Sequence, residues 1–238
     1  MGGPRMFENQ LEPGEMLNTY PELKKYAKTH QLCVLKEVIE IDVTRNGNAF
    51  AAQSRIVMKL NMLKEDDEDS IYMGVWDSPE CKDSSSFTKE KFALTVLDEE
   101  SKELKVKWGE SRGMKKRFSV YLGKLLNIGE SMSFKATMFL PNFYDVSPER
   151  KEEYFDLDIH HPTMISVVKI KLPEGLAIAK KSLRYLYEDD KPCPKPRDHV
   201  VKMDNYENRY IIAYRYLWPA VGKIYYLRWN WKRLLKKN

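Results

Sequence analysis

The chain has 238 residues, of which 42% are hydrophobic and 12% aromatic, a composition typical of a globular protein. Forty basic and 35 acidic residues give a net charge of only +5, well below the excess expected of a dedicated nucleic-acid binder. The three cysteines are scattered and form no Cys-x-x-Cys pair, which argues against a zinc ribbon, a redox motif or a disulfide framework. We therefore expect a cytoplasmic protein without a secretory signal or a transmembrane segment.

The first expected element is a short helix over residues 21–31. Pro21 suits the first helical turn, and Thr19 is placed where it could cap the helix. Leu23 and Tyr26 recur at helical spacing, so they are expected to share one face.

A β-hairpin is predicted next, around Asn46-Gly47. Residues 39–43 alternate apolar and polar side chains, which is the pattern of a half-buried strand. Asn-Gly favours a tight hairpin turn because both residues tolerate positive φ. The return strand extends to about residue 63. Its two faces are an apolar row of Phe50, Ala52, Ile56, Met58, Leu60 and Met62 and a polar row of Gln53, Arg55, Lys59 and Asn61.

The remaining chain reads as short strands separated by turns and loops. These strands are expected at residues 71–76, 92–97, 104–108, 117–122, 133–140, 154–160, 165–172, 183–187, 210–218 and 223–231. Residues 92–108 and 210–231 are both predicted to form hairpins. The acidic run at 65–69 is expected to be a solvated loop, and residues 191–197 are too rich in proline for a helix or a central strand.

About eleven strands with almost no helical periodicity predict a mainly β protein, an antiparallel β-sandwich with a short N-terminal helix. The expected organisation is an N-terminal extension over residues 1–32, one β-sandwich domain over residues 33–231 and a basic tail over residues 232–238.

Motifs for catalysis are missing from the sequence. It contains no Gly-x-Ser-x-Gly elbow, no Gly-x-Gly-x-x-Gly and no P-loop, and it has only four histidines. Cys193 and His199 could form a nucleophile pair only if the fold brought them together beside an orienting group. A plain loop cysteine is the simpler interpretation, and we expect neither enzymatic activity nor a cofactor.

Asp156, Asp158 and His160 alternate along one predicted strand and therefore share a face. Carboxylates and imidazole are ligands of divalent metals. Same-face neighbours on a strand lie about 7 Å apart, so one ion could bind two of them at most. The polar outer face of an ordinary strand is the simpler interpretation, and a metal-dependent enzyme at these residues is kept as a second alternative.

Aromatic and cationic residues crowd the last two predicted strands. Aromatic rings beside cations can bind a protein partner or stack nucleic-acid bases, and the same rings can also fill a core. The predicted binding surface consists of Arg209, Tyr214, Tyr216, Trp218, Tyr226, Arg228, Lys232 and Arg233. The leading hypothesis is a non-enzymatic module that binds a protein partner through this hairpin. The alternative is a nucleic-acid-binding protein that uses the same hairpin and the basic tail.

The closing segment also carries a resemblance to known proteins. Leu217-Trp218-Pro219, Gly222 and the run from Tyr225 to Trp231, together with residues 40–43 ahead of Asn46-Gly47, resemble a family of uncharacterised β-rich domains. Such domains occur in prokaryotic regulatory and signalling proteins. The resemblance covers residues 34–231 and implies an antiparallel β fold and a sensing or partner-binding role, with no catalytic residues.

Overall fold

The computed structural model describes residues 13–62, 69–75, 92–109, 116–144, 146, 152–187, 190–204 and 209–233. Strands make up 58% of the protein and helices 7%, which confirms a mainly β protein. The described residues form fourteen strands, more than the eleven or so expected from the sequence.

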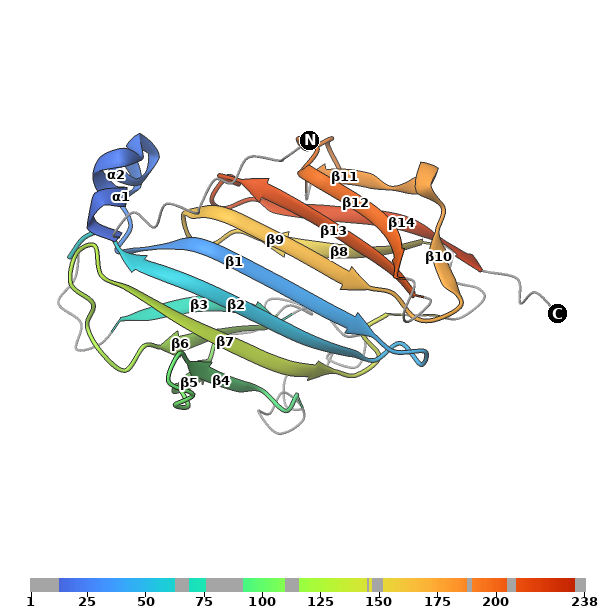
Figure 1. The fold of residues 1–238 in the computed structure, drawn as a ribbon, viewed down its shortest axis with the longest axis horizontal. Helices are drawn as coiled ribbons and strands as arrows, with labels where there is room; N and C mark the ends of the chain where they lie inside the picture. The colour runs from blue at the N-terminus through green and yellow to red at the C-terminus, as the bar shows by residue number, and fades with distance from the viewer. Residues whose placement is uncertain are drawn as a thin grey trace.

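The helices and strands follow one another from the N-terminal helix pair to the long last strand (Figure 1). Their bounds are α1 Pro13–Thr19, α2 Pro21–Tyr26, β1 Leu32–Val43, β2 Ala49–Lys59, β3 Ser70–Val75, β4 Thr95–Asp98, β5 Val106–Trp108, β6 Lys116–Tyr121, β7 Ser131–Leu140, β8 Glu152–Asp158, β9 Thr163–Lys171, β10 Leu176–Ile178, β11 Arg184–Tyr187, β12 Arg197–Asp204, β13 Arg209–Leu217 and β14 Ile224–Arg233, with a 3-10 turn at Lys180–Ser182.

The strands form three hydrogen-bonded sheets. The largest has seven strands in the order β12-β13-β9-β1-β2-β7-β4. A four-stranded sheet joins β10, β14 and β11, with β8 also paired to β14, and a three-stranded sheet has the order β3-β6-β5. The strand pairs are antiparallel except β1 and β9, which run parallel, so the large sheet is mixed rather than purely antiparallel.

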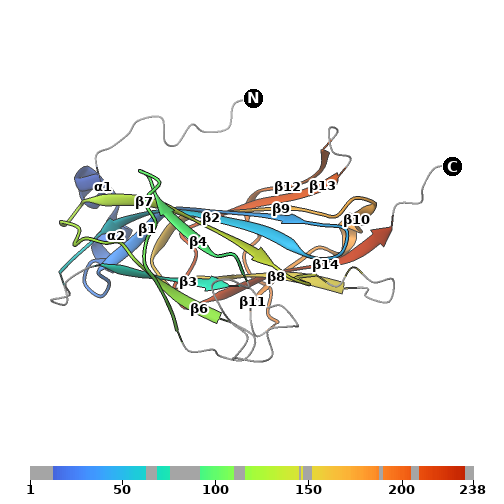
Figure 2. The ribbon, with the colours of Figure 1, turned by 90° about the horizontal axis from the view of Figure 1, so that it is seen from below.

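Figure 2 shows the seven-stranded sheet as one layer and the two smaller sheets as the other. The hydrophobic core joins both layers. It contains Ile39 and Val168 from the large sheet, Phe118 from the three-stranded sheet, and Phe155 and Trp229 from the four-stranded sheet. Burial of apolar side chains between the layers is the main stabilising contribution to this arrangement.

The turn between β1 and β2 forms as predicted at Asn46-Gly47. Gly47 has φ +84°, and a Cβ atom there would lie 2.1 Å from the carbonyl oxygen of Tyr144. The Tyr144 N–H donates a 2.9 Å hydrogen bond to the Gly47 carbonyl. Glycine is therefore needed both for the backbone conformation and for the close approach of the 143–144 segment.

The predicted hairpin at 92–108 forms only near its turn, where Leu97 pairs antiparallel with Glu103 and the Leu104 N–H donates a 2.8 Å hydrogen bond to the Val96 carbonyl. The predicted hairpin at 210–231 is wrong, and in both cases the chain goes on to cross from one layer to the other. β4 pairs with β7 in the large sheet, whereas β5 pairs with β6 in the three-stranded sheet. β13 pairs with β9 and β12, whereas β14 pairs with β8, β10 and β11.

The N-terminal helices cover one end of the large sheet. Leu23 is fully buried and packs in a cluster with Cys33, Met58 and Met164. The helix predicted over 21–31 ends at Tyr26, and the Thr19 hydroxyl donates to the Glu15 carbonyl instead of capping it. No helix among the described residues is long and apolar enough to cross a membrane.

Part of strand β2 has its two faces the opposite way round from what its hydrophobic pattern indicates, whereas Met58 and Leu60 of the predicted apolar row are buried beside the N-terminal helices. Gln53, Arg55 and Lys59 of the polar row are buried, at 3%, 7% and 1% exposure. In the apolar row, Phe50 is 57% exposed and Ile56 is 38% exposed. This inversion brings charged groups into the protein interior and leaves large apolar side chains in solvent.

Candidate functional site

The predicted aromatic surface is divided between the core and two different faces of the molecule. Tyr214 and Tyr216 lie on the inner face of β13 and are buried. The ring of Tyr216 lies 4.6 Å from the ring of Tyr225, which comes from β14 in the opposite layer. These tyrosines fill the space between the layers, so they cannot form an exposed partner surface.

Two further members of that surface have structural contacts. Arg209 donates from Nε to the Leu172 carbonyl at 2.7 Å and from Nη2 to Asp42 Oδ1 and the Val43 carbonyl, both at 2.5 Å. This guanidinium therefore joins the ends of β1 and β13. Trp218 packs against Tyr20, with 6.2 Å between their ring centroids, beside the helix pair.

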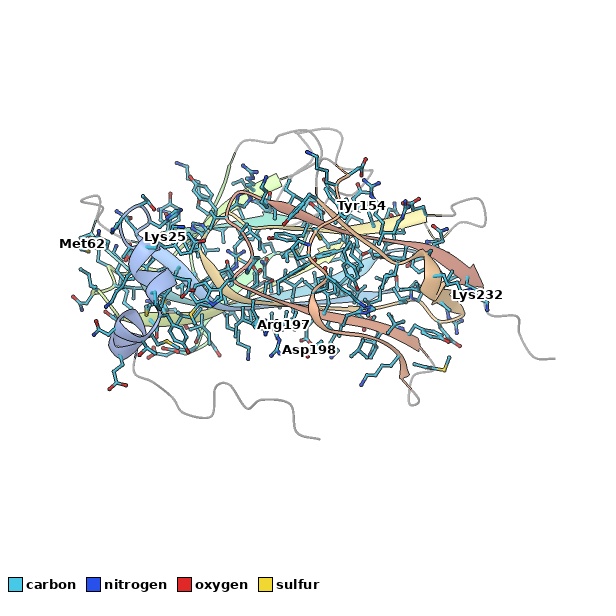
Figure 3. All side chains as sticks on the ribbon, turned by 90° about the horizontal axis from the view of Figure 1, so that it is seen from above. Lys25, Met62, Tyr154, Arg197, Asp198 and Lys232 are labelled. Carbon is cyan, nitrogen blue, oxygen red and sulfur yellow. The ribbon has the colours of Figure 1, made fainter. Side chains whose placement is uncertain are left out.

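The outward-facing members on β14 lie on the opposite side of the molecule from the large sheet. The Arg228 guanidinium lies 5.6 Å from the centre of the Tyr226 ring and 2.6 Å from Asp190. Lys232 is exposed near the end of β14 (Figure 3). Arg233 is the last residue of that strand, and the rest of the predicted basic tail lies outside the described residues.

The candidate metal ligands form a local polar arrangement rather than a metal centre. His160 Nε2 lies 2.8 Å from Asp158 Oδ2, which also lies 3.4 Å from Arg117 Nη2. Asp156 is buried on the same strand. In the part of the chain that the structure describes, no three His, Cys, Asp or Glu side chains are grouped so that they could hold a metal ion.

Cys193 and His199 both lie beside Tyr185, but they do not resemble an activated pair. The Cys193 thiol is 3.5 Å from the Tyr216 hydroxyl, and burial raises its pKa. The His199 ring packs edge-on against Tyr185 at 5.5 Å, and burial lowers its pKa. Burial therefore favours the neutral form of both groups, whereas a nucleophilic cysteine needs its thiolate form.

The inner face of β2 carries a buried polar network. Glu37 Oε1 accepts hydrogen bonds from Gln53 Nε2 at 2.6 Å and Arg55 Nε at 2.7 Å, and Oε2 accepts from the Ser166 hydroxyl at 3.0 Å. Arg55 Nη1 donates to the Tyr72 carbonyl of β3 at 2.6 Å. The network joins β1, β2 and β9 of one layer to β3 of the other.

A second buried ion pair lies further along β2. Lys59 Nζ donates to Asp69 Oδ1, and Asp69 Oδ2 accepts from the Leu126 backbone N–H at 2.9 Å. Asp69 is 2% exposed, so the end of the acidic run is buried and not solvated as predicted. The carboxylate ties the segment before β3 to the loop between β6 and β7.

His161 accepts a hydrogen bond from the backbone of β3, where the Glu37–Arg55 network also meets that strand. Its Nε2 accepts a 3.1 Å hydrogen bond from the Tyr72 N–H, and the two rings are stacked 6.3 Å apart. Burial, together with the charge of Arg55, lowers the pKa of His161 to about 3. A neutral imidazole is required here, since a protonated Nε2 could not accept this hydrogen bond.

The opposite side of the large sheet is an exposed surface with apolar and cationic side chains. We use the term outer face for the side of this sheet that points away from the smaller sheets, toward the viewer in Figure 1. Phe50 on β2 and Phe139 on β7 are cross-strand neighbours whose ring centroids lie 5.2 Å apart. A shallow groove of about 300 Å³ continues along the face, and both cations and acids line it, among them Lys36, Ile56, Asp98, Glu99, Ser133 and Lys135.

Cations outnumber acids at the outward strand positions whose side chains the structure describes. The cations are Lys36, Lys135, Lys169, Lys171, Arg197, Lys202, Arg209 and Arg215, and the acids are Glu40, Asp42 and, in the bulge of β12, Asp198. Glu40 lies 3.2 Å from Lys169, and Asp198 at the sheet margin pairs with Arg215. Lys36, Lys135 and Lys202 form no ion pair with any described residue.

Sequence reasoning missed this surface. The apolar row of β2 has the spacing of a core-facing row, and no local signal shows that Gln53, Arg55 and Lys59 take the core face instead. Their partners Glu37 and Asp69 lie 10 to 18 residues away in sequence. A weaker indication was the presence of possible partners. Long polar side chains on a buried strand face need partners of opposite charge, and Glu37 and Asp69 are both close enough in sequence to provide them.

No protein-family model and no curated protein matches the chain. Among solved structures, it is similar to a candidate nutrient-binding protein from Legionella pneumophila, with 10% identity and a TM-score of 0.48 over 83% of this chain and 67% of that one. It is also similar to an M1 zinc metallopeptidase from Deinococcus radiodurans, with 12% identity and a TM-score of 0.45. That match covers 84% of this chain but only 42% of the peptidase. These likenesses carry no functional assignment for this chain.

Proposed function

We propose that the chain is a non-enzymatic binding module, built as a β-sandwich, and that the outer face of the seven-stranded sheet is its binding surface. The observation that carries this proposal is the inversion of β2. Its three long polar side chains are buried, while Phe50 and Ile56 face solvent.

Stability alone does not explain this arrangement. Burying a charged pair costs desolvation energy that its mutual attraction offsets only with good geometry, and apolar replacements are often as stable or more so. Phe50 and Ile56 are only partly buried, so each contributes less than the roughly 1.5–3 kcal/mol of a fully buried side chain. Departures from the rule that apolar side chains are buried and charged ones exposed occur mainly at functional sites. This favours a binding role for Phe50 and Ile56.

The form of the surface is that of a binding site more than a reaction centre. It is a shallow face with paired aromatic rings and a groove, and the ionisable side chains that line the groove are of both signs. Burial raises the pKa of Cys193 and lowers the pKa of His199, which is the opposite of what an activated cysteine–histidine pair needs. A role in a prokaryotic regulatory or signalling system, inferred from sequence resemblance, stays a prediction.

The proposal is tested by affinity capture of the tagged protein from its native lysate, with and without nuclease, read by mass spectrometry. The wild type is compared with Phe50→Ser/Phe139→Ser. A matched control is Ile128→Ser, because Ile128 is 56% exposed but lies outside the sheet. We expect a specific partner with the wild type and the control and its loss with the double variant. Equal capture by all three proteins, or robust hydrolytic activity, would contradict the proposal.

A further inference from the structure

We propose that the outer face binds single-stranded nucleic acid, with bases stacking on Phe50 and Phe139 and phosphates lying along the surrounding lysines. This inference rests on the proposed function and adds the chemical class of the partner. It moves the nucleic-acid hypothesis from the C-terminal strands, where Tyr214 and Tyr216 are buried, to strands β2 and β7 of the large sheet.

Phe50 and Phe139 form a platform for bases. Their rings are 5.2 Å apart with a 50° angle between planes, on the neighbouring strands β2 and β7. Phe50 is 57% exposed, so its ring is accessible to a base. Exposed aromatic side chains on a sheet surface are a recurrent way of stacking unpaired bases, and stacking tolerates any sequence because every base has a π-face.

The cations of the outer face flank this platform. In the cross-strand row of Phe50 the next residue is Asp42, followed by Lys171 and, two strands further, Lys202, and Lys135 and Lys169 lie one or two rows away. Eight cations and three acids occupy the described outward positions, and the acids Asp98 and Glu99 line the groove, while the whole chain has a net charge of +5. The fold thus collects on one face the positive charge that composition alone does not indicate, and this face complements a polyanion.

The shape of the surface favours a single strand over a duplex. No described helix projects from the outer face to enter a major groove: the N-terminal helices lie packed on one end of the sheet, and only the β12–β13 pair curves outward, at the far edge from Phe50 (Figures 1 and 2). Rings that lie on a sheet can meet a base only when that base is unpaired and splayed out. The groove beside Ile56 extends the surface for neighbouring nucleotides, with Lys36 and Lys135 and also the acids Asp98 and Glu99 in its lining.

The test is fluorescence anisotropy with a labelled 20-nucleotide oligouridylate, a 20-nucleotide oligothymidylate and a duplex of the same length. Four proteins are compared: the wild type, Phe50→Ser/Phe139→Ser, Lys36→Gln/Lys135→Gln, and a control, Lys28→Gln/Lys107→Gln. The control removes two exposed lysines that lie outside the outer face, on the turn after α2 and on β5. Circular dichroism and thermal melting verify that each variant is folded.

We expect the single strands to bind the wild type and the control more tightly than the duplex does. Affinity should fall steeply with salt, because bound lysines release counterions from the phosphates. The phenylalanine variant should bind about 5- to 150-fold more weakly, since stacking contributes about 1–3 kcal/mol per base. The Lys36→Gln/Lys135→Gln variant should lower the logarithmic salt slope by about 1.4, at about 0.7 per phosphate contact.

Two results would overturn the inference. One is no binding of either single strand by the wild type at low salt. The other is equal binding by the wild type and both outer-face variants, which would put the nucleic-acid site elsewhere. If oligonucleotides fail while a nuclease-resistant partner is still captured through Phe50 and Phe139, the proposed binding surface stands and its partner is a protein.

Discussion

The two sides of strand β2 differ in what they bury and what they expose. On the inner side, Arg55 and Lys59 are buried beside Glu37 and Asp69, with each charge paired. On the outer side, Phe50 and Ile56 are exposed with no covering element among the described residues. The inner side is therefore expected to determine stability, whereas the outer side is free to bind. The predictions below test this division, from the largest expected effect to the smallest.

The largest effect is expected from Lys59→Met. The substitution leaves the Asp69 carboxylate buried without its cation, and breaking a buried pair in this way costs about 3–5 kcal/mol. The double variant Lys59→Met/Asp69→Asn should recover most of this loss, because it removes both charges and keeps a side-chain oxygen for the Leu126 N–H. Urea unfolding measures the free energies. A single variant as stable as the wild type would show that the pair is not buried as described.

A comparable loss is expected from Tyr216→Ala, which removes a ring packed between the layers. Truncation of a buried aromatic side chain costs about 3–5 kcal/mol. Tyr226→Ala, on the outward side of β14, should cost much less, because Tyr226 is only partly buried. Thermal unfolding of the two variants side by side measures the difference. Equal losses would contradict the assignment of Tyr216 to the core and Tyr226 to a surface.

The junction at His161 should make stability depend on pH. The folded-state pKa is about 3, below the usual value of 6.5, so the unfolded chain takes up a proton first as the pH falls. Stability contributed by the neutral imidazole is complete above pH 6.5 and falls by about 1.4 kcal/mol per pH unit toward pH 3.

The measurement is urea unfolding at pH 7, 6, 5 and 4 for the wild type, His161→Gln and the exposed control His30→Gln. Glutamine can still accept from the Tyr72 N–H but does not titrate. We expect His161→Gln to lose stability less steeply below pH 6 than the other two proteins. Parallel curves for all three would mean that His161 is not held neutral in the folded protein.

The smallest effect on stability is expected from Phe50→Ser. The ring is largely in solvent, and surface substitutions away from specific contacts change stability by about 0.5 kcal/mol or less. The same substitution should weaken partner binding strongly. A large loss of stability, measured by urea unfolding, would indicate that Phe50 supports the fold rather than a binding surface.

The fold was predictable from sequence where a local pattern matched the final environment. The alternation at 39–43, the Asn46-Gly47 turn, and the core positions of Phe155, Leu157 and Ile159 are all confirmed. Strand β12 was missed because its sequence, RDHVVKMD, has little alternation, as is common for an edge strand.

Strand pairing and the direction of faces were less predictable, since both depend on distant partners. Sequential strands are neighbours only about two-thirds of the time, and β13 and β14 are an exception that crosses between layers. The polar face of β2 became the inner one because Glu37, Ser166 and Asp69 meet it in three dimensions. Because the polar face of β2 is buried, the face with Phe50 and Ile56 points outward, and no motif within β2 itself indicates this.

The most direct test of the central claim is lysine footprinting, in which acetylation of the protein is compared with and without excess oligouridylate and read by mass spectrometry. We predict that Lys36, Lys135, Lys169 and Lys202 on the outer face become protected, while Lys28 and Lys107 react equally in both samples. Protection confined to Lys232 or to lysines of the smaller sheets, with the outer face unchanged, would contradict the assignment of the binding surface.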